Sequence, residues 1–181
     1  MKLSRDQILN TTLTIAKEIG WANTSVREIS KRIRYSTIKI YSEFGNKDNL
    51  FIELQKRGFE VLRQVYVEAS ESGKNAEEQL HAICQAHLEF SFTHRTYYEI
   101  MFSLNGASCK GELGPTLKKT SEPVRAALEK IDGGASTEAF FNWWSLLHGF
   151  VVVTQNDASK SRKTKSEILR VLVQNLIKGL R

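Results

Sequence analysis

The sequence predicts an all-α fold of about nine helices, and three observations support this prediction. The chain of 181 residues contains only two prolines, so long helices can run without interruption. Apolar residues make up 41% of the chain, which is enough to bury a core. Within several segments these residues recur at helical spacing, and short polar or glycine-containing stretches separate the segments.

Three helices are predicted in the first 50 residues. The first covers about residues 4–19, where isoleucine, leucine and threonine recur on one face. A second begins after Ser25, because Ser25 and Glu28 have the spacing of a capping box. Ser36 offers the N-cap of a third, short helix that runs through Tyr41. Two short helices separated by a tight turn are typical of a helix-turn-helix, with the second as the recognition helix.

The charge is distributed unevenly along the chain. Residues 1–50 carry nine Lys/Arg and five Asp/Glu, whereas residues 51–156 carry ten and thirteen. This pattern favours a DNA-binding head and a body that does not touch DNA. Residues 157–181 are again basic, with seven cations and two anions, and we interpret them as a solvated loop leading into a helix, with a second nucleic-acid patch as the alternative. The cations at its start are Lys160, Arg162, Lys163 and Lys165.

Glycine, aromatic, capping and lysine positions recur through the first 50 residues in a defined order. They are Gly20, Trp21, Thr24, Ser25, Ile29, Ser30, Ser36, Tyr41, Phe44, Lys47 and Leu50. In identity and spacing this set resembles the DNA-binding domain of TetR-type transcriptional regulators. The resemblance covers residues 4–50, and it implies a three-helix head followed by a helical domain that binds a ligand and forms a dimer.

This chain departs from the family pattern at three positions. The family usually has a small residue and then glycine at the turn between the two short helices, where this chain has Ile33 and Arg34. A left-handed backbone at Arg34 would cost about 1–2 kcal/mol that glycine avoids. The family also tends to a small residue in the middle of the recognition helix, where this chain has Ile38. An operator sequence therefore cannot be transferred from relatives.

The start of the recognition helix supplies the candidate contacts to base edges. Ser36, Thr37 and Lys39 lie there, and a lysine suits the O6 and N7 acceptors of guanine. We therefore expect Lys39→Ala to relax the preference at one base pair per half-site.

A second set of side chains is assigned to the DNA backbone. By the resemblance, Tyr41 and Lys47 hold phosphates. Lys47 also stands in the first turn of the next helix, where a cation is unfavourable unless an anion lies nearby, and a phosphate would supply that anion. Thr24 and Ser25 complete this set.

The resemblance divides the chain into a helix-turn-helix DNA-binding domain, residues 1–50, and a ligand-binding and dimerisation domain, residues 51–181. A helix over about residues 47–72 is predicted to connect the two domains. Pro123 marks either a new helix start or a kink. The remaining helices are predicted over about residues 76–94, 97–102, from Pro115 onward, 136–155 and 163–180, with a loop at 105–114.

The last two predicted helices have apolar residues on more than one side and should therefore be covered on more than one side. In TetR-type proteins the last two helices of each subunit form a four-helix dimer interface, which the resemblance assigns to this pair. The candidate interface residues are Phe140, Val151, Leu169, Leu172, Val173 and Leu176. In addition, Trp144, His148 and Gly149, together with residues 97–102, resemble the WHG subgroup of TetR carboxy-terminal domains.

Aromatic residues in the body offer a candidate effector site. They lie at helical spacing and are first of all core residues, but regulators of this family hold their effector among these helices. His148 is open to two interpretations, a satisfied core or interface histidine and a ligand contact. The candidate effector contacts are Phe92, Met101, Trp144 and His148.

The sequence gives little support to catalysis or to a metal site. It contains no GxGxxG, P-loop, GxSxG or HExxH motif, so neither an enzyme nor a cofactor is expected. His87 and His94 could share one helix face but have no acidic or thiol partner at metal-binding spacing. Cys84 and Cys109 suggest core or surface thiols. With no long apolar run and no signal core, we expect a cytoplasmic protein that does not insert into a membrane.

The function predicted from the sequence is a homodimeric, sequence-specific transcriptional regulator, a repressor that a small-molecule effector releases from a palindromic operator in double-stranded DNA. Two other classes remain open. A sequence-independent architectural protein would bind random and palindromic DNA equally. A small-molecule carrier or enzyme would bind or turn over its ligand with no dependence on DNA.

Overall fold

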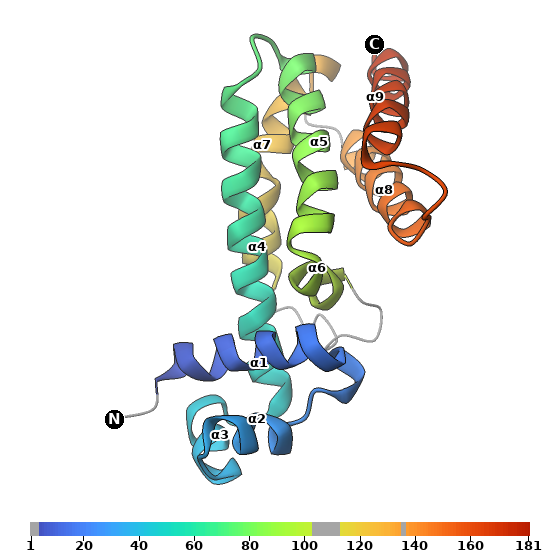
Figure 1. The fold of residues 1–181 in the computed structure, drawn as a ribbon. Coiled ribbons are helices and arrows are strands. Elements are labelled where there is room, and N and C mark those ends of the chain that lie inside the picture. The colour runs from blue at the N-terminus through green and yellow to red at the C-terminus, as the bar shows by residue number, and fades with distance from the viewer. Residues whose placement is uncertain (1–3, 103–112, 135–136) are drawn as a thin grey trace. The chain divides into compact units, whose positions relative to one another are not determined.

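The computed structural model describes residues 4–102, 113–134 and 137–181 (Figure 1). Every regular element in these residues is helical, which confirms the predicted all-α fold of about nine helices. Most of the predicted loop at 105–114, and Cys109, lie outside the described residues. The elements are α1 (Arg5–Ile19), η1 (Trp21–Asn23), α2 (Val26–Ile33), α3 (Thr37–Phe44), α4 (Lys47–Glu71), α5 (Ala76–Thr93), α6 (Arg95–Phe102), α7 (Gly114–Asp132), α8 (Thr137–Thr154) and α9 (Arg162–Gly179).

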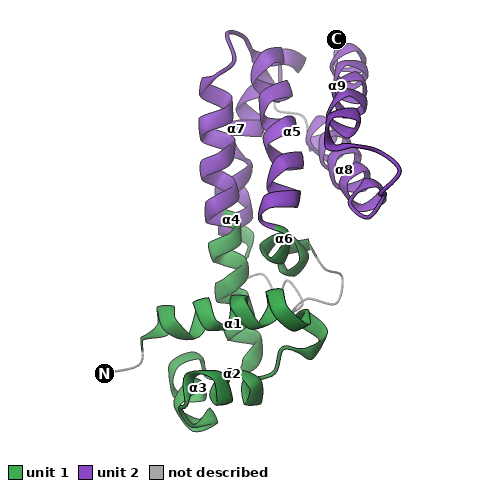
Figure 2. Ribbon diagram, in the orientation of Figure 1, with its two compact units in different colours: residues 1–59, 95–114 green, residues 60–94, 115–181 purple. Residues whose placement is uncertain are grey.

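The chain forms two compact units (Figure 2). The head comprises residues 1–59 and 95–114, and the body comprises residues 60–94 and 115–181. Helix α4 contributes residues to both units, and α6 belongs to the head although it follows the first long helix of the body in sequence. The division of function at residue 50 stays a prediction.

Helix starts in the head depend on side-chain caps. Ser4 and Gln7 form a complete capping box at the start of α1, with the Gln7 amide nitrogen 3.2 Å from Ser4 Oγ. Ser25 caps α2 by accepting from the Glu28 amide at 3.2 Å. The return bond from the Glu28 side chain is not formed among the described residues, so the predicted capping box is present there only in part.

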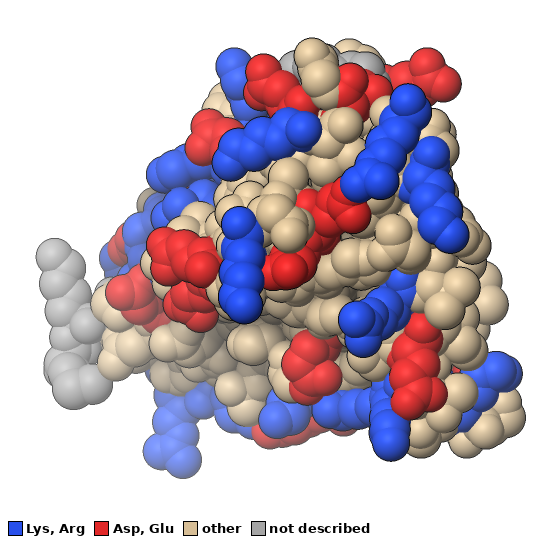
Figure 3. Space-filling view, turned by 90° about the horizontal axis from the view of Figure 1, so that it is seen from above, with Lys and Arg blue, Asp and Glu red and all other residues tan. Residues whose placement is uncertain are grey.

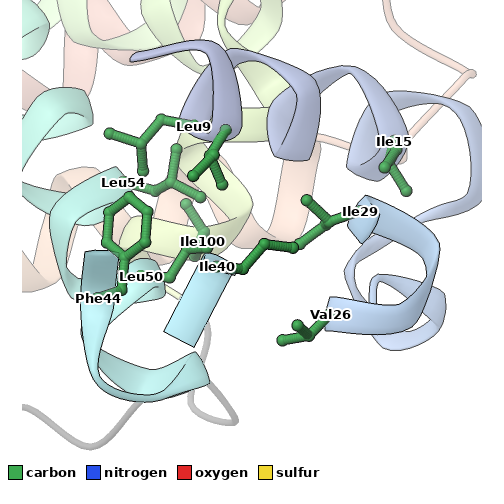
Figure 4. Close-up of a cluster of buried hydrophobic side chains, with 10 residues drawn as sticks. Leu9, Ile15, Val26, Ile29, Ile40, Phe44, Leu50, Leu54 and Ile100 are labelled. Atoms are coloured by element: carbon green, nitrogen blue, oxygen red, sulfur yellow. The ribbon is translucent and has the colours of Figure 1, made fainter. Parts of the chain in front are cut away.

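The head has one apolar core, which Figure 4 shows between α1, α2, α3, α4 and α6. Helix α3 runs to Phe44 rather than stopping near Tyr41, because Phe44 is buried in this core. The core residues are Ile8, Leu9, Ile15, Val26, Ile29, Ile40, Phe44, Leu50, Leu54 and Ile100. Burial of side chains of this size stabilises a domain by about 1.5–3 kcal/mol each.

Helix α6 is fastened to the head by specific contacts. The indole nitrogen of Trp21 donates to the Thr96 carbonyl at 2.9 Å, and the Gln55 side-chain amide donates to the Ile100 carbonyl at 2.8 Å. Met101 packs so closely on Gly58 of α4 that a Cβ at position 58 would overlap its side chain. These contacts explain why α6 joins the head rather than the body.

In the body, α5 packs against α8 and α9, and α8 also packs against α9 (Figure 1). Large side chains such as Trp143, Leu80 and Leu147 fill the interior. Pro123 lies inside α7, so it does not start a new helix. Of the two possibilities that the sequence left open, a new helix start is therefore excluded.

Some cations of the basic carboxy-terminal segment are paired with acids of the same unit. Lys160 contacts Asp157 at 2.9 Å, and Arg162 contacts Glu89 at 3.2 Å. Figure 3 shows cations and anions interspersed on one face of the molecule, with no large area of a single sign. Lys165 differs, because it is only 5% exposed and its ammonium group lies 5.4 Å from the Phe92 ring. The prediction of a solvated segment is therefore wrong for Lys165, and the exposed pairs contribute little to stability.

Candidate nucleic-acid interface and effector region

The turn between α2 and α3 has a left-handed residue. Arg34 has φ 58° and ψ 39°, and it is the only non-glycine residue with positive φ in the described ranges. Ser30 anchors this turn, because its carbonyl accepts from the Tyr35 amide at 3.2 Å and its hydroxyl donates to the Tyr35 carbonyl. The strain expected at Arg34 is therefore present, and Ser30 holds the residue in place.

Helix α3 has a buried face and an exposed face. Ile40 and Phe44 point into the head core, whereas Ile38 and Tyr41 are 77% and 44% exposed. Ser36 caps the helix by accepting from the Lys39 amide at 3.3 Å. Its first turn is thus fixed with side chains directed outward, as a recognition helix requires.

Lys39, the predicted guanine contact, is already engaged. Its ammonium group lies 2.7 Å from a Glu43 carboxylate oxygen one turn along the helix. The backbone carbonyl of Glu43 accepts a hydrogen bond from the Arg5 side chain of α1, and this bond holds the main chain at Glu43 in place. Contact between Lys39 and a base would therefore have to replace or share this ion pair.

Among the predicted phosphate contacts, Tyr41 and Lys47 are exposed and Ser25 is half-buried at the start of α2. The Lys47 ammonium lies 4.9 Å from the Phe51 ring, which supports its position without neutralising its charge. Thr24 differs from these residues, because it is buried and its hydroxyl donates to the Gly20 carbonyl at 2.9 Å. A phosphate contact by Thr24 would require this bond to break.

The head has further cations that the sequence did not assign to DNA. Arg27, Lys31 and Arg34 are exposed and form no ion pair with any residue that the structure describes. Arg32, in contrast, makes two hydrogen bonds to Glu18 of α1, at 3.1 and 2.6 Å. These bonds hold the pKa of Glu18 below its ordinary value. Unpaired cations are free to attract an anion such as a phosphate. Which cations are unpaired can be seen in the structure but not in the sequence.

In the body, a buried polar pair lies among aromatic rings. The Tyr66 hydroxyl and His87 Nδ1 are 2.6 Å apart, and both residues are buried. Burial, with a smaller contribution from the charge of His148, lowers the pKa of His87 to about 3. His87 is therefore neutral near pH 7. The edge of Trp144 faces its ring, with centroids 6.3 Å apart, and Trp144 stacks on His148 at 5.4 Å.

The four predicted effector contacts do not form one group. Trp144 and His148 lie together beside His87. The Phe92 ring lies instead under two cations of α9, Arg162 at 4.8 Å and Lys165 at 5.4 Å. Met101 is buried in the head against Gly58. Sequence periodicity did not single out Tyr66, and it placed His87 at core spacing without its partner. The hydrogen bond between the two residues connects α4 and α5 within the body.

A separate open groove of about 360 Å³ lies between α5 and α9. Its lining is mainly polar and charged, and Gln85 and Ser166 within it hydrogen-bond to each other at 2.6 Å. This groove could accept a polar molecule, but it lacks the aromatic walls expected of an effector site.

The predicted dimer residues are mostly committed within the subunit. Val151, Leu169 and Val173 are fully buried in the described chain. Leu172 and Leu176 are half-buried, as is Phe140, whose ring lies 3.8 Å from the Arg125 guanidinium carbon. The exposed large apolar residues of α8 and α9 are Phe141, Val152, Val153 and Val171.

Cys84 is buried in the body. The Cys84 sulfur accepts from the Trp143 indole at 3.2 Å, and burial raises the pKa of its thiol to about 12. Cys84 is therefore a core thiol. His94 stacks on Phe90, apart from the Tyr66–His87 pair. In the parts of the chain that the structure describes, no three metal-type side chains cluster, and no helix has the length and hydropathy needed to cross a membrane.

A three-helix head with a capped, outward-facing recognition helix defines the class of helix-turn-helix DNA-binding proteins. Residues 8–54 match a family model described as bacterial regulatory proteins, tetR family, and residues 80–176 match one described as tetracyclin repressor-like, C-terminal domain. The second match alone covers more than half of the chain. The protein therefore belongs to the TetR family of DNA-binding transcriptional regulators. The WHG subgroup stays a prediction.

Solved structures of the same fold cover nearly the whole chain. A TetR-like transcriptional regulator from Rhodococcus sp. RHA1 is 19% identical, with a TM-score of 0.70, over 98% of this chain and 100% of that one. PfmR from Thermus thermophilus is 18% identical, with a TM-score of 0.67, over 96% and 98%. The fatty acid degradation regulator FadR from Bacillus halodurans is 18% identical, with a TM-score of 0.66, over 100% and 99%. A comparison with the curated proteins gives no match.

Proposed function

We propose that this protein is a homodimeric, sequence-specific transcriptional repressor that a small-molecule effector releases from its operator. The observation that carries this proposal is the outer face of α3, where the capped helix exposes Ile38 and Tyr41, while α2 carries unpaired cations. A bacterial regulator of this kind acts on the chromosome, so we place the protein in the cytoplasm.

In this proposal α3 enters the major groove. Ser36, Thr37 and Lys39 reach base edges from the start of the helix, and Lys39 exchanges Glu43 for guanine acceptors. At a base pair that offers Lys39 no acceptor, the Lys39 ammonium stays paired with Glu43 and gains nothing from the DNA. Specificity then comes from the difference in free energy between the Glu43 pair and the guanine contact.

The proposed phosphate contacts surround this helix. Ser25 and Lys47 lie at the starts of α2 and α4, and Tyr41 lies on the exposed side of α3. Arg27 and Lys31 add unpaired charge on α2. Each phosphate neutralised releases counterions, so the logarithm of affinity falls by roughly 0.9 per contact for each tenfold rise in salt. Binding should therefore weaken steeply as salt is raised.

The dimer in this proposal forms through the outer face of α8. Phe141 and Val152 lie eleven residues apart and so share one side of the helix, with Ser145 and Gly149 exposed between them. A Cβ at Gly149 would meet nothing within 4 Å, so a second helix can approach closely there. Apolar ends with small residues between them suit a self-complementary helix contact about a twofold axis. Two heads then require an inverted repeat with half-site centres about 34–36 Å apart.

The effector in this proposal binds near the Tyr66–His87 pair, where Trp144 and His148 provide stacked rings. A neutral, buried imidazole beside aromatic walls suits an uncharged or aromatic molecule with few polar groups. To change from 1% to 99% released, the effector must prefer the non-binding geometry by about 5.5 kcal/mol.

The test is selection of bound sequences from random duplex DNA by the purified protein at two salt concentrations. Enrichment of an inverted repeat with half-sites about one helical turn apart is expected. On the selected duplex, Tyr41→Phe should weaken binding without changing base preference, whereas Lys39→Ala should relax preference at one base pair per half-site. Equal binding to random and selected DNA would place the protein in the alternative class of architectural DNA-binding proteins.

A further inference from the structure

The recognition helix carries a large apolar side chain on its outer face. Ile38 is 77% exposed, more than any other large hydrophobic residue among those described. Residues of an α-helix follow one another by about 100°, which places Ile38 about 200° from the buried Ile40. It therefore points directly away from the head core, and burial within the head does not explain it.

We propose that Ile38 contacts the 5-methyl group of a thymine in the major groove and selects thymine at one position of each half-site. This inference rests on the proposed function, because it requires α3 to enter the groove. The methyl group is the one apolar feature that a base pair presents there, and only an A·T pair carries it. An exposed isoleucine at this place has that group as its complementary partner.

Ile38 is better prepared for a base contact than its neighbour. The Lys39 ammonium must leave or share Glu43 at 2.7 Å before it can bind guanine. Ile38 needs only to lose water, and its branched side chain has one strongly preferred χ1 rotamer in a helix. Contact therefore costs little side-chain entropy, and the removal of apolar surface from water favours it.

The same side chain should reject other bases. Placed against the amino group of cytosine or the O6 of guanine, Ile38 would take a polar group out of water without offering a hydrogen bond. Selection for thymine thus arises from attraction to its methyl group and from the cost of desolvating polar groups of cytosine or guanine.

The experiment removes the methyl group from the DNA and the side chain from the protein separately. In the duplex selected by the wild-type protein, each thymine is replaced in turn by deoxyuridine, in both half-sites, and Kd is measured for wild type, Ile38→Val and Ile38→Ala. At one position we expect the wild type to bind roughly fourfold more weakly per methyl group lost, or about fifteenfold for both half-sites. Ile38→Val should keep most of this ratio, whereas Ile38→Ala should bind thymine and uracil duplexes equally.

Two controls separate this test from general effects. Leu117→Ala removes a half-exposed leucine from α7 in the body and should leave every ratio unchanged. Circular dichroism should show Ile38→Ala folded, since an exposed residue is replaced by a better helix former.

The outcomes are distinct. If the wild type shows no sequence-specific binding, the proposed function fails. If specific binding is present but no uracil substitution weakens it, the role of Ile38 is overturned. The same holds if Ile38→Ala keeps the thymine preference, and the exposed Ile38 side chain then has another partner.

Discussion

The head carries its candidate functional groups on its surface, whereas the body encloses its candidate polar pair. In the head, an apolar core supports capped helices, and the groups proposed to meet DNA, such as Lys47 and Arg27, are outside. In the body, the polar Tyr66–His87 pair is inside, while Val152 and Val153 of α8 are exposed. The head therefore presents the groups proposed to meet DNA on its surface, and the body encloses its polar pair and presents an apolar surface on α8.

This difference decides how each unit can be tested. Changes on the surface of the head should alter DNA binding with little effect on folding. Changes to the buried pair of the body should alter stability first, and changes to the outer face of α8 should alter assembly. A surface change in the head that unfolds the protein, or a change of the buried pair that leaves its stability intact, would contradict this difference between the units.

The largest effect is expected from charges on the outer face of α8. Val152→Asp combined with Val153→Asp places like charges opposite each other across the proposed twofold axis, so the dimer should dissociate. Loss of the second head should weaken operator binding by about 10²–10⁴-fold, because the two heads no longer bind as one unit. Analytical ultracentrifugation and Kd measurement check this. Lys178→Asp, on the exposed face of α9, is a control that should remain dimeric.

A dimer that survives both aspartates would show that another surface joins the subunits.

The next effect is a dependence of stability on pH. Burial lowers the pKa of His87 in the folded chain to about 3, whereas its ordinary value is 6.5. Between these two pH values the His87 imidazole binds a proton in the unfolded chain but not in the folded chain. Stability should therefore be unaffected above about pH 7 and fall as the pH drops, by about 2 kcal/mol between pH 7.5 and pH 5. Urea unfolding across this range measures it. A flat profile would mean that His87 accepts a proton in the folded state.

Removing the Tyr66 hydroxyl should have an effect of similar size. Tyr66→Phe keeps the ring and its packing but leaves His87 Nδ1 without the hydroxyl 2.6 Å away, so the free energy of unfolding should fall by about 1–3 kcal/mol. Thermal unfolding measures this change. Tyr41→Phe, which removes an exposed hydroxyl in the head, is the matched control and should leave stability nearly unchanged. Equal effects of the two substitutions would contradict the buried polar pair.

How much of the molecule could be predicted from the sequence differs between the units. The head was predictable because its caps and turn are local signals: Ser36 caps α3, and the left-handed Arg34 follows from its place at the turn. The bounds of most helices were also predicted to within two residues. What the sequence could not show was that Lys39 is held by Glu43 and that Thr24 is buried, since both depend on side-chain positions.

The body was less predictable because α8 is apolar on nearly every side. Val151 was assigned to the dimer interface, but it is buried within the subunit, whereas its neighbours Val152 and Val153 are exposed. The sequence-based prediction also grouped Met101 with Trp144, although Met101 belongs to the head. Which apolar side faces inward is decided by packing between helices distant in sequence, and that information is not local.

The smallest effect is expected at the strained turn of the head. Arg34→Gly removes the cost of a side chain in the left-handed region, φ 58°, and part of this gain is offset by the greater freedom of glycine in the unfolded chain. The head should be stabilised by about 1 kcal/mol or less. Because an exposed cation is also lost, DNA affinity should fall slightly and its salt dependence should become shallower. Arg34→Ala separates the two effects, since it removes the charge and keeps the strain.

In the proposed complex, two α3 helices, one from each subunit, enter successive major grooves on one side of the DNA. Hydroxyl-radical footprinting of the selected duplex tests this arrangement most directly. The wild-type protein should protect two backbone segments on the same face, with centres about one helical turn apart. The protein with Val152→Asp and Val153→Asp should lose this paired pattern. A single protected segment, or uniform protection that does not depend on sequence, would contradict the account.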